Sequence, residues 1–182
     1  MNLSNKIIAA VRSHEELLKA AQSDVKIVFD LAPDILTVGE RAEILHKAGK
    51  TFFIHIDLAD GIGKDRSGII YVKNAGVDGI ISTRSAIIKT AREEGLFTVQ
   101  RFFILDSHSI DTTVEALKSS KAQMIEVMPG IAGKVIKKLK KTVEIPIIAG
   151  GLIENEEEAR EAISCGASAV STGKEDLWNL CD

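Results

Sequence analysis

Eight short apolar runs, separated by amphipathic segments, limit this chain to very few folds. The runs are rich in Ile, Val and Phe, as expected for parallel strands buried on both faces. They are Lys6–Arg12, Val25–Leu31, Thr51–Leu58, Asp78–Thr83, Phe97–Leu105, Gln123–Met128, Glu144–Gly150 and Ser168–Thr172. The intervening segments include Ser13–Ala21, Thr37–Ala48, Thr83–Glu94 and Asn155–Ser164. Eight strand–helix units favour a closed (β/α)8 TIM barrel, an α/β fold, over an open sheet with edges to protect.

The length sets the domain organisation. The 182 residues predict one compact barrel domain, 1–182, with a sizeable core. Because about 250 residues is typical of this fold, the loops are expected to be brief. Several predicted helices stop at a glycine suited to the position after the helix cap, namely Gly49, Gly76, Gly95 and Gly166.

Charge and cysteine content limit the partners and the cellular compartment that the sequence predicts. A formal charge of −3 argues against a surface coated in positive potential, so contact with nucleic acid needs a local patch. Cys165 and Cys181 have no disulfide-framework or metal-site spacing. No signal core and no membrane span is apparent, which predicts a cytoplasmic protein without a membrane partner.

Two neighbouring strand ends near the C-terminus predict a phosphate site. The run ending in Gly150-Gly151 and the run ending in Ser171-Thr172-Gly173 both stop at residues that can offer backbone N–H groups to an anion. Asn155 is placed to cap a helix whose first turn is acidic. A (β/α)8 barrel commonly holds phosphate after its seventh and eighth strands. We therefore expect a small phosphorylated ligand there.

Polar residues at other strand ends are candidates for contact with the rest of that ligand. They are Arg12, His55, Asp57, Arg101 and Glu126. His55 and Asp57 are two residues apart, so they should point to the same side of their strand. His55, like Gln100, could instead be a satisfied residue lining the barrel. Asp106-Ser107 is expected to cap the following helix more than to take part in chemistry.

Glu126 should be paired. It shares one side of its strand with Met124 and Met128, and a charge in an apolar run is costly unless a cation meets it. Arg101 or Arg12 is the natural partner. Such a pair could serve the ligand or be purely structural.

Signs of catalysis are weak. No lysine ends a middle strand, where a Schiff-base aldolase would need one, and Lys174 is expected to border the phosphate. No resident metal or cofactor is expected, although Asp57 with Glu126 could hold Mg²⁺ weakly. The site therefore resembles one that binds without reacting.

A lysine-rich segment is the one dense basic patch in the sequence. Gly133–Lys141 reads as an amphipathic helix whose exposed side is almost wholly lysine. Lys134, Lys137, Lys138 and Lys141 could contact a nucleic-acid backbone. The alternative is a solvated helix face with lysines near its C-terminus.

Five ordered motifs carry a resemblance to a known family. They are Phe53–Leu58, Gly79–Arg84, Gln100–Ser107, Ile125–Gly130 and Ile148–Ile153. With them, from Ala9 to Trp178, the chain closely resembles the bacterial glycerol uptake operon antiterminator regulatory proteins. The resemblance implies a regulator that responds to glycerol 3-phosphate and binds the leader of a glycerol-gene messenger RNA, preventing premature termination. It also implies that the ligand phosphate sits on Gly150, Gly151, Ser171 and Thr172.

The combined hypothesis is a non-enzymatic, ligand-responsive antitermination regulator. Glycerol 3-phosphate, or a similar small phosphate, and the mRNA leader are its expected partners. The rival is a TIM-barrel enzyme acting on a small phosphorylated substrate: a phosphosugar isomerase or lyase, or a metal-dependent glycerophosphodiester hydrolase. The sequence leaves the oligomeric state open.

Overall fold

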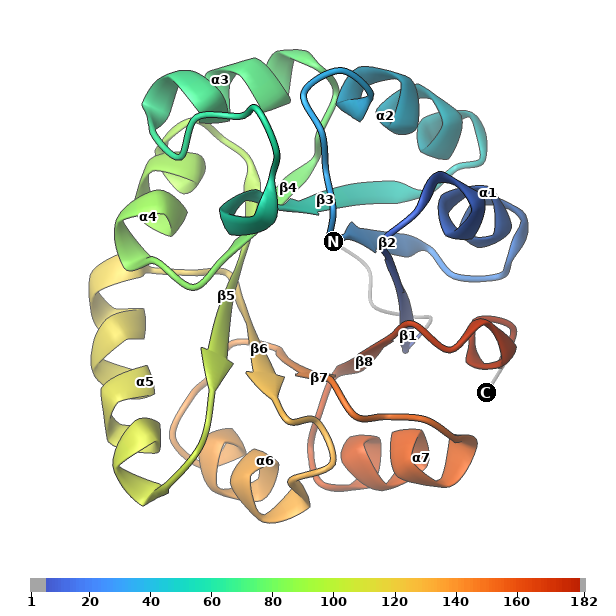
Figure 1. Ribbon diagram of the computed structural model, residues 1–182. Helices are drawn as coiled ribbons and strands as arrows, with labels where there is room; N and C mark the ends of the chain where they lie inside the picture. The colour runs from blue at the N-terminus through green and yellow to red at the C-terminus, as the bar shows by residue number, and fades with distance from the viewer. Residues whose placement is uncertain (1–5, 181–182) are drawn as a thin grey trace.

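A computed structural model describes residues 6–180, without the side chains of residues 107 and 108, and its strands close into a parallel barrel. Each strand pairs with the next, and β8 returns to β1 (Figure 1). The strands are β1 (Ile7–Val11), β2 (Ile27–Asp30), β3 (Thr51–His55), β4 (Gly79–Ser82), β5 (Phe97–Phe103), β6 (Met124–Met128), β7 (Ile147–Gly150) and β8 (Ala169–Thr172). The predicted (β/α)8 fold is confirmed.

Seven α-helices of the described chain surround the barrel. They are α1 (His14–Gln22), α2 (Val38–Lys47), α3 (Arg66–Asn74), α4 (Ser85–Glu93), α5 (Ser107–Ser120), α6 (Gly133–Lys140) and α7 (Glu156–Ser164). In the described chain, β8 is followed by the short 3-10 helix Glu175–Leu177 and by no eighth α-helix. Trp178 follows this 3-10 helix, is 1% exposed within the hydrophobic core and donates its Nε1–H to the carbonyl of Thr172.

Several expected caps are confirmed. Asn155 is the N-cap of α7 and accepts a hydrogen bond from the Glu158 N–H, and Asp106 caps α5 in the same way. The four glycines expected after helix caps all have positive φ, at +70° (Gly49), +94° (Gly76), +85° (Gly95) and +109° (Gly166).

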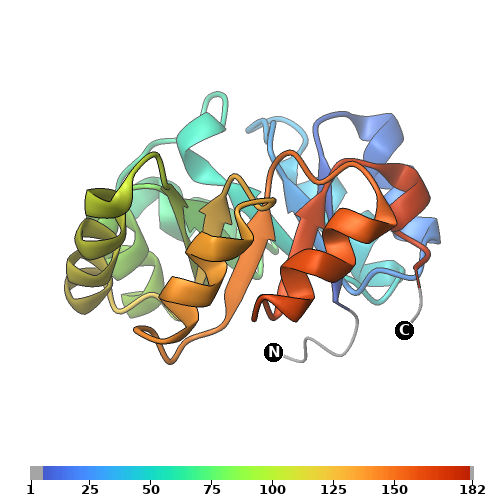
Figure 2. The ribbon, with the colours of Figure 1, turned by 90° about the horizontal axis from the view of Figure 1, so that it is seen from below.

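Alternation along the strands divides the core into two parts. One cluster fills the barrel and includes Phe29, Phe53 and Met124. The other clusters lie between strands and helices and include Ile125 and Val127. This confirms that Met124 and Ile125 face opposite sides of β6. Inward-facing residues near the strand ends are therefore presented at one end of the barrel, toward which the arrows point in Figure 2.

Most strand limits lie within two residues of those expected, with two exceptions. β3 ends at His55, because Ile56–Leu58 forms a 3-10 helix that turns Asp57 toward β4. The expectation that His55 and Asp57 share one face of a strand is therefore wrong, because Asp57 lies outside β3. β7 begins only at Ile147, after Pro146.

Two further expectations concern cysteines and membranes. Cys165 is buried and forms no disulfide within residues 6–180, and Cys181 lies outside the described residues. In the portion of the chain that the structure describes, no helix has the length and apolar character needed to span a lipid bilayer.

Candidate ligand site at the mouth of the barrel

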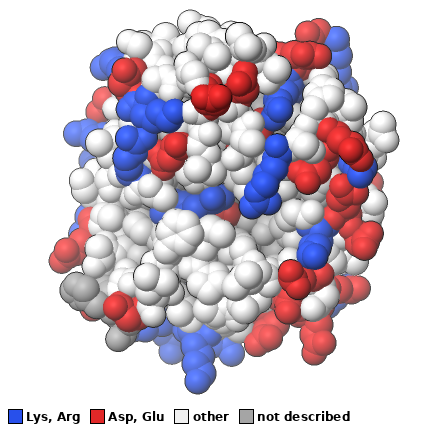
Figure 3. All heavy atoms as spheres, viewed as in Figure 1, with Lys and Arg blue, Asp and Glu red and all other residues white. Residues whose placement is uncertain are grey.

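A cavity of about 320 Å³ opens at the C-terminal ends of β1, β5, β6, β7 and β8. This volume lies near the lower end of the range for small-molecule sites. Figure 3 shows this face of the molecule, with a central hollow that has Lys and Arg atoms around it. The lining residues are Ala10, Arg12, Leu31, Arg101, Glu126, Met128, Gly151, Leu152, Ile153, Glu154, Ser171, Thr172, Gly173 and Lys174.

Seven of the predicted site residues meet there. They are Arg12, Arg101, Glu126, Gly151, Ser171, Thr172 and Gly173, and Lys174 is also present as expected. Gly150, His55 and Asp57 are not among the residues that line this cavity. Sequence reasoning missed Met128, and it also missed the segment Leu152–Glu154, whose signal was its place directly after Gly150-Gly151.

The loop between β7 and α7 contains three successive backbone N–H groups without an acceptor in the described chain. The carbonyl oxygens of Gly150 and Gly151 both accept the Gly130 N–H, at 2.6 and 3.0 Å. Gly151 and Leu152 have φ values of +76° and +60°. Among the described residues, the N–H groups of Gly151, Leu152 and Ile153 have no acceptor. Successive N–H groups of this kind form a concave site for an anion.

Leu152 is the unusual residue of this loop. A non-glycine residue at positive φ is uncommon and costs about 1–3 kcal/mol, and such residues cluster at ligand sites. The residue is 64% exposed, so burial of its side chain does not offset the cost. The conformation keeps the loop amides beside the cavity.

The end of β8 contributes differently from what its sequence suggests. The Ser171 hydroxyl donates to Glu126 Oε1 at 2.5 Å, and the Thr172 hydroxyl donates to the Ile153 carbonyl at 2.9 Å. Thr172 Oγ1 also accepts the Lys174 N–H. Both hydroxyls are therefore engaged within the protein. The free donor on this side, within the described chain, is the N–H of Gly173.

Two cations flank these amides. An Arg12 guanidinium nitrogen lies 3.7 Å from the position that a Cβ on Gly173 would occupy, and the Arg12 side chain has no ion-pair partner in residues 6–180. The Lys174 ammonium lies 3.8 Å from Glu154 Oε1 and is half exposed. Backbone donors and two cations thus converge on one side of the cavity.

The floor of the cavity holds a buried ion pair. Arg101 Nε lies 2.6 Å from Glu126 Oε2, and the two side chains are 7% and 1% exposed. Of the two arginines considered from the sequence, Arg101 is the partner. Gly150 makes room for this arrangement, because a Cβ there would lie 2.4 Å from Glu126 Oε1 and 2.7 Å from Ser171 Oγ.

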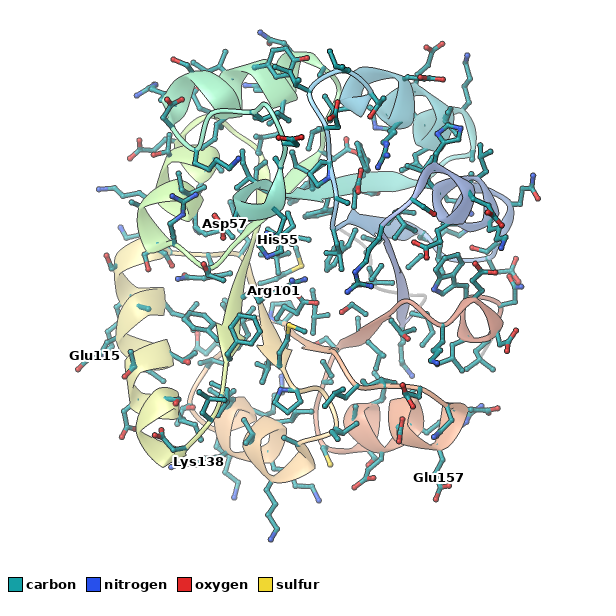
Figure 4. All side chains as sticks on the ribbon, viewed as in Figure 1. His55, Asp57, Arg101, Glu115, Lys138 and Glu157 are labelled. Carbon is teal, nitrogen blue, oxygen red and sulfur yellow. The ribbon has the colours of Figure 1, made fainter. Side chains whose placement is uncertain are left out.

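His55 lies in the barrel close to Arg101, as Figure 4 shows. It is 3% exposed, and its Nδ1 has no hydrogen-bond partner in the described structure. Burial, reinforced by the positive charge of Arg101, lowers the pKa of His55 to about 4. The imidazole is therefore neutral near pH 7.

Asp57 belongs to a separate network between β3 and β4. It accepts hydrogen bonds from the hydroxyls of Ser82 and Thr83, from the Thr83 N–H and from Arg84. Burial raises the pKa of Asp57, but these donors outweigh it and hold the pKa below its usual range. Asp57 and Glu126 are thus bound to different partners. No group of three His, Cys, Asp or Glu side chains suited to a metal ion occurs among residues whose side chains are described.

The predicted lysine helix is confirmed as α6, with Ile136 and Leu139 buried beneath it. Lys134, Lys137, Lys138 and Lys141 are all exposed and, within the described chain, make no ion pair. Lysine atoms gather over α6 at the lower edge of the face in Figure 3, while acidic atoms gather over neighbouring α7. Lys138 points outward, away from the barrel mouth (Figure 4).

The sequence and the fold of this chain match those of known proteins. The family model of the glycerol-3-phosphate responsive antiterminators matches residues 7–178. The chain belongs to the glycerol-3-phosphate responsive antiterminator family. This confirms the resemblance drawn from the five sequence motifs.

Individual relatives agree with this assignment. An uncharacterized protein of Escherichia coli K12, YgcP, is 37% identical over 177 residues, covering 97% of this chain and 93% of that protein. A solved glycerol uptake operon antiterminator regulatory protein from Listeria monocytogenes is 30% identical with a TM-score of 0.90, covering 96% and 95%. A solved glycerol uptake operon antiterminator-related protein from Thermotoga maritima is 36% identical with a TM-score of 0.84, covering 94% and 96%.

More distant barrels include enzymes. An aldolase is 16% identical with a TM-score of 0.76, covering 96% of this chain and 93% of its own. At that identity the similarity shows the fold alone.

Proposed function

We propose that this antiterminator-family protein is a cytoplasmic, non-enzymatic sensor that binds glycerol 3-phosphate at the barrel mouth. The phosphate binds to the N–H groups of Gly151, Leu152, Ile153 and Gly173, flanked by Arg12 and Lys174. The glycerol hydroxyls reach the floor at Arg101 and Glu126. In its bound state the protein engages the leader mRNA of glycerol-utilisation genes.

The observation that carries the ligand proposal is a set of backbone donors that have no acceptor among residues 6–180 and lie beside two cations. Gly151 is half-buried and Ile153 is buried, and N–H groups at such positions normally have partners. A cluster of N–H groups without acceptors beside a cavity is suited to an anion. A phosphate monoester carries close to two negative charges at pH 7, which Arg12 and Lys174 would balance. Ser171 and Thr172 would act through the scaffold, because their hydroxyls hold Glu126 and the β7–α7 loop in place.

Calorimetry tests this binding directly. The protein should bind glycerol 3-phosphate and should bind glycerol much more weakly, because glycerol lacks the group that the amides and cations hold. Inorganic phosphate should compete with glycerol 3-phosphate. Equal affinity for glycerol and glycerol 3-phosphate, or no binding of either, contradicts the proposal.

The RNA part of the proposal places the nucleic-acid backbone on α6. Its support is the row of exposed lysines, which make no ion pair with any described residue, in a protein of net negative charge. Filter binding with leader RNA over a range of salt concentrations should give a steep negative log–log slope. Charge reversal of Lys137, Lys138 and Lys141 should weaken binding, whereas reversal of the exposed Lys89 on α4 should have little effect. Unchanged binding by the α6 variant removes this helix from the interface.

A catalytic role is the alternative, and the observation that favours it is a buried carboxylate, Glu126, at the floor of a cavity. Turnover of a small phosphorylated substrate with Mg²⁺ or Mn²⁺, lost in Glu126→Gln, would support an enzyme. Binding of glycerol 3-phosphate with no turnover under those conditions would support the sensor.

A further inference from the structure

The floor of the cavity differs in chemistry from its phosphate-facing side. Each carboxylate oxygen of Glu126 accepts one hydrogen bond: Oε2 accepts from Arg101 and Oε1 accepts from Ser171. A carboxylate can accept about four hydrogen bonds, so two acceptor positions remain. Arg101 uses only Nε, and its terminal guanidinium N–H groups have no acceptor among the described residues. The floor therefore offers both donors and acceptors to a ligand.

The charges on the two sides also differ. Arg12 and Lys174 favour an anion beside the amides of the β7–α7 loop. At the floor, Arg101 is already neutralised by Glu126, and the pair is almost fully buried. A second anion placed against Glu126 would meet a like charge in a medium that screens it poorly. A hydroxyl group, which both donates and accepts, matches the floor without adding charge.

We propose that Glu126 is the specificity-determining residue of this site: it selects a hydroxyl group, and rejects a carboxylate, at the end of the ligand away from its phosphate. This inference rests on the proposed binding of a three-carbon phosphate at the barrel mouth. Glu126 is thus the residue that discriminates between a phosphorylated polyol and a phosphorylated hydroxy acid.

The position of Glu126 is held from three sides. Arg101 faces it in the β5–β6 register, Ser171 donates to it from β8, and Gly150 on β7 leaves the space that its carboxylate occupies. A Cβ on Gly150 would lie 2.4 Å from Glu126 Oε1, so only glycine allows this placement without a shift. The carboxylate is thus fixed in place before any ligand arrives, as a selective contact requires.

The experiment compares two ligands that differ at one end only. Calorimetry of the intact protein with glycerol 3-phosphate and with 3-phosphoglycerate should show at least about a tenfold preference for glycerol 3-phosphate, because like charges brought together at a binding site are strongly unfavourable. In Glu126→Gln, Arg101 loses its counter-ion. The preference should then shrink by at least about tenfold, through tighter binding of 3-phosphoglycerate and weaker binding of glycerol 3-phosphate.

Two controls separate selectivity from folding. Glu115→Gln removes the same charge from an exposed position on α5, far from the mouth (Figure 4), and should leave the preference unchanged. Inorganic phosphate should bind Glu126→Gln about as well as it binds the wild type, which shows that the phosphate side is intact. Should that variant fail to fold, the double variant Arg101→Gln/Glu126→Gln, which leaves no unpaired charge, should also lose the preference.

The outcomes distinguish this inference from the function on which it rests. Wild-type protein that binds neither three-carbon phosphate nor inorganic phosphate overturns the proposed ligand site and this inference together. Wild-type protein that binds both three-carbon phosphates within about twofold overturns only the inference. A preference that persists in a folded Glu126 variant also overturns it, because a purely structural ion pair would behave in that way.

Discussion

Arg101 and Glu126 are register partners on β5 and β6, and the guanidinium Nε lies 2.6 Å from the carboxylate Oε2 at the buried floor of the barrel mouth. Taking one partner away leaves the other charge buried and unpaired, which typically costs 3–5 kcal/mol. The pair therefore lines the cavity and is also a contact on which the stability of the fold depends.

Arg101→Met should lower the free energy of unfolding by about 3–5 kcal/mol, measured by urea denaturation at pH 7. Its control is Arg160→Met, which removes an arginine from the exposed pair with Glu156 and should cost less than about 1 kcal/mol. Equal, small losses in both variants would mean that the buried carboxylate finds another partner.

His55 should make the protein less stable as the pH falls. Its pKa in the folded protein is about 4, below the ordinary value of 6.5, so the unfolded chain takes up a proton first. The neutral imidazole of His55 makes its full contribution to the unfolding free energy above pH 6.5, and this contribution is lost as the pH drops toward 4. Between pH 7 and pH 5, wild-type protein should lose about 2 kcal/mol more unfolding free energy than His55→Asn does.

The control for this prediction is His46→Asn. His46 lies on α2, and its side chain is 42% exposed beside Asp78. Its replacement should leave most of the wild-type pH dependence in place. If His55→Asn titrates with the same slope as wild type, the buried imidazole does not carry the effect.

Gly151→Ala should weaken both the fold and ligand binding. Gly151 has a φ of +76°, and a Cβ there would lie 2.5 Å from the terminal methyl of Met128, which also lines the cavity. We expect a loss of stability of about 1–3 kcal/mol, together with weaker binding of glycerol 3-phosphate because the loop amides are displaced.

Gly49→Ala is matched for backbone conformation, since Gly49 has a φ of +70° and no atom within 4 Å of its Cβ position. It should cost about 1 kcal/mol through backbone strain alone and leave glycerol 3-phosphate binding unchanged. Thermal unfolding and calorimetry on both variants give the comparison. Wild-type affinity in Gly151→Ala would show that the β7–α7 amides do not hold the phosphate.

Arg12→Met should reduce the affinity for glycerol 3-phosphate by roughly 10- to 100-fold, as loss of a charge-assisted hydrogen bond commonly does. Because the Arg12 side chain is exposed and has no ion-pair partner in the described chain, unfolding free energy should change by less than about 0.5 kcal/mol. Lys89→Met, on the outer face of α4, is the control for loss of a positive charge. A binding constant that does not change in Arg12→Met would remove this guanidinium from the phosphate site.

Much of the scaffold follows from local sequence. Runs rich in Ile, Val and Phe predict buried strands, and Gly49, Gly76, Gly95 and Gly166 mark helix ends because each adopts positive φ there. Asn155 and Asp106 cap helices through bonds to residues three positions away. These features depend on neighbours within a few residues, which is why they can be read from the order of residues alone.

The site itself required contacts between segments far apart in the chain. Sequence left Arg12 and Arg101 as equal candidates for pairing with Glu126, and only the β5–β6 register selects Arg101. The sequence suggests that the Ser171 hydroxyl is available to a ligand. In the fold, that hydroxyl donates a hydrogen bond to Glu126 across the barrel.

The composition and periodicity of this chain thus determined a (β/α)8 barrel with its polar groups at one end, because composition and periodicity are properties of residues that are neighbours in the sequence. Tertiary structure alone decided which donors remain available to a ligand. The left-handed turn at Leu152, and the orientation of the Gly150 and Gly151 carbonyls toward Gly130, leave the loop amides free. Hydrogen-bond capacity is shared among all groups that meet in space, so what is free at a site depends on the whole fold.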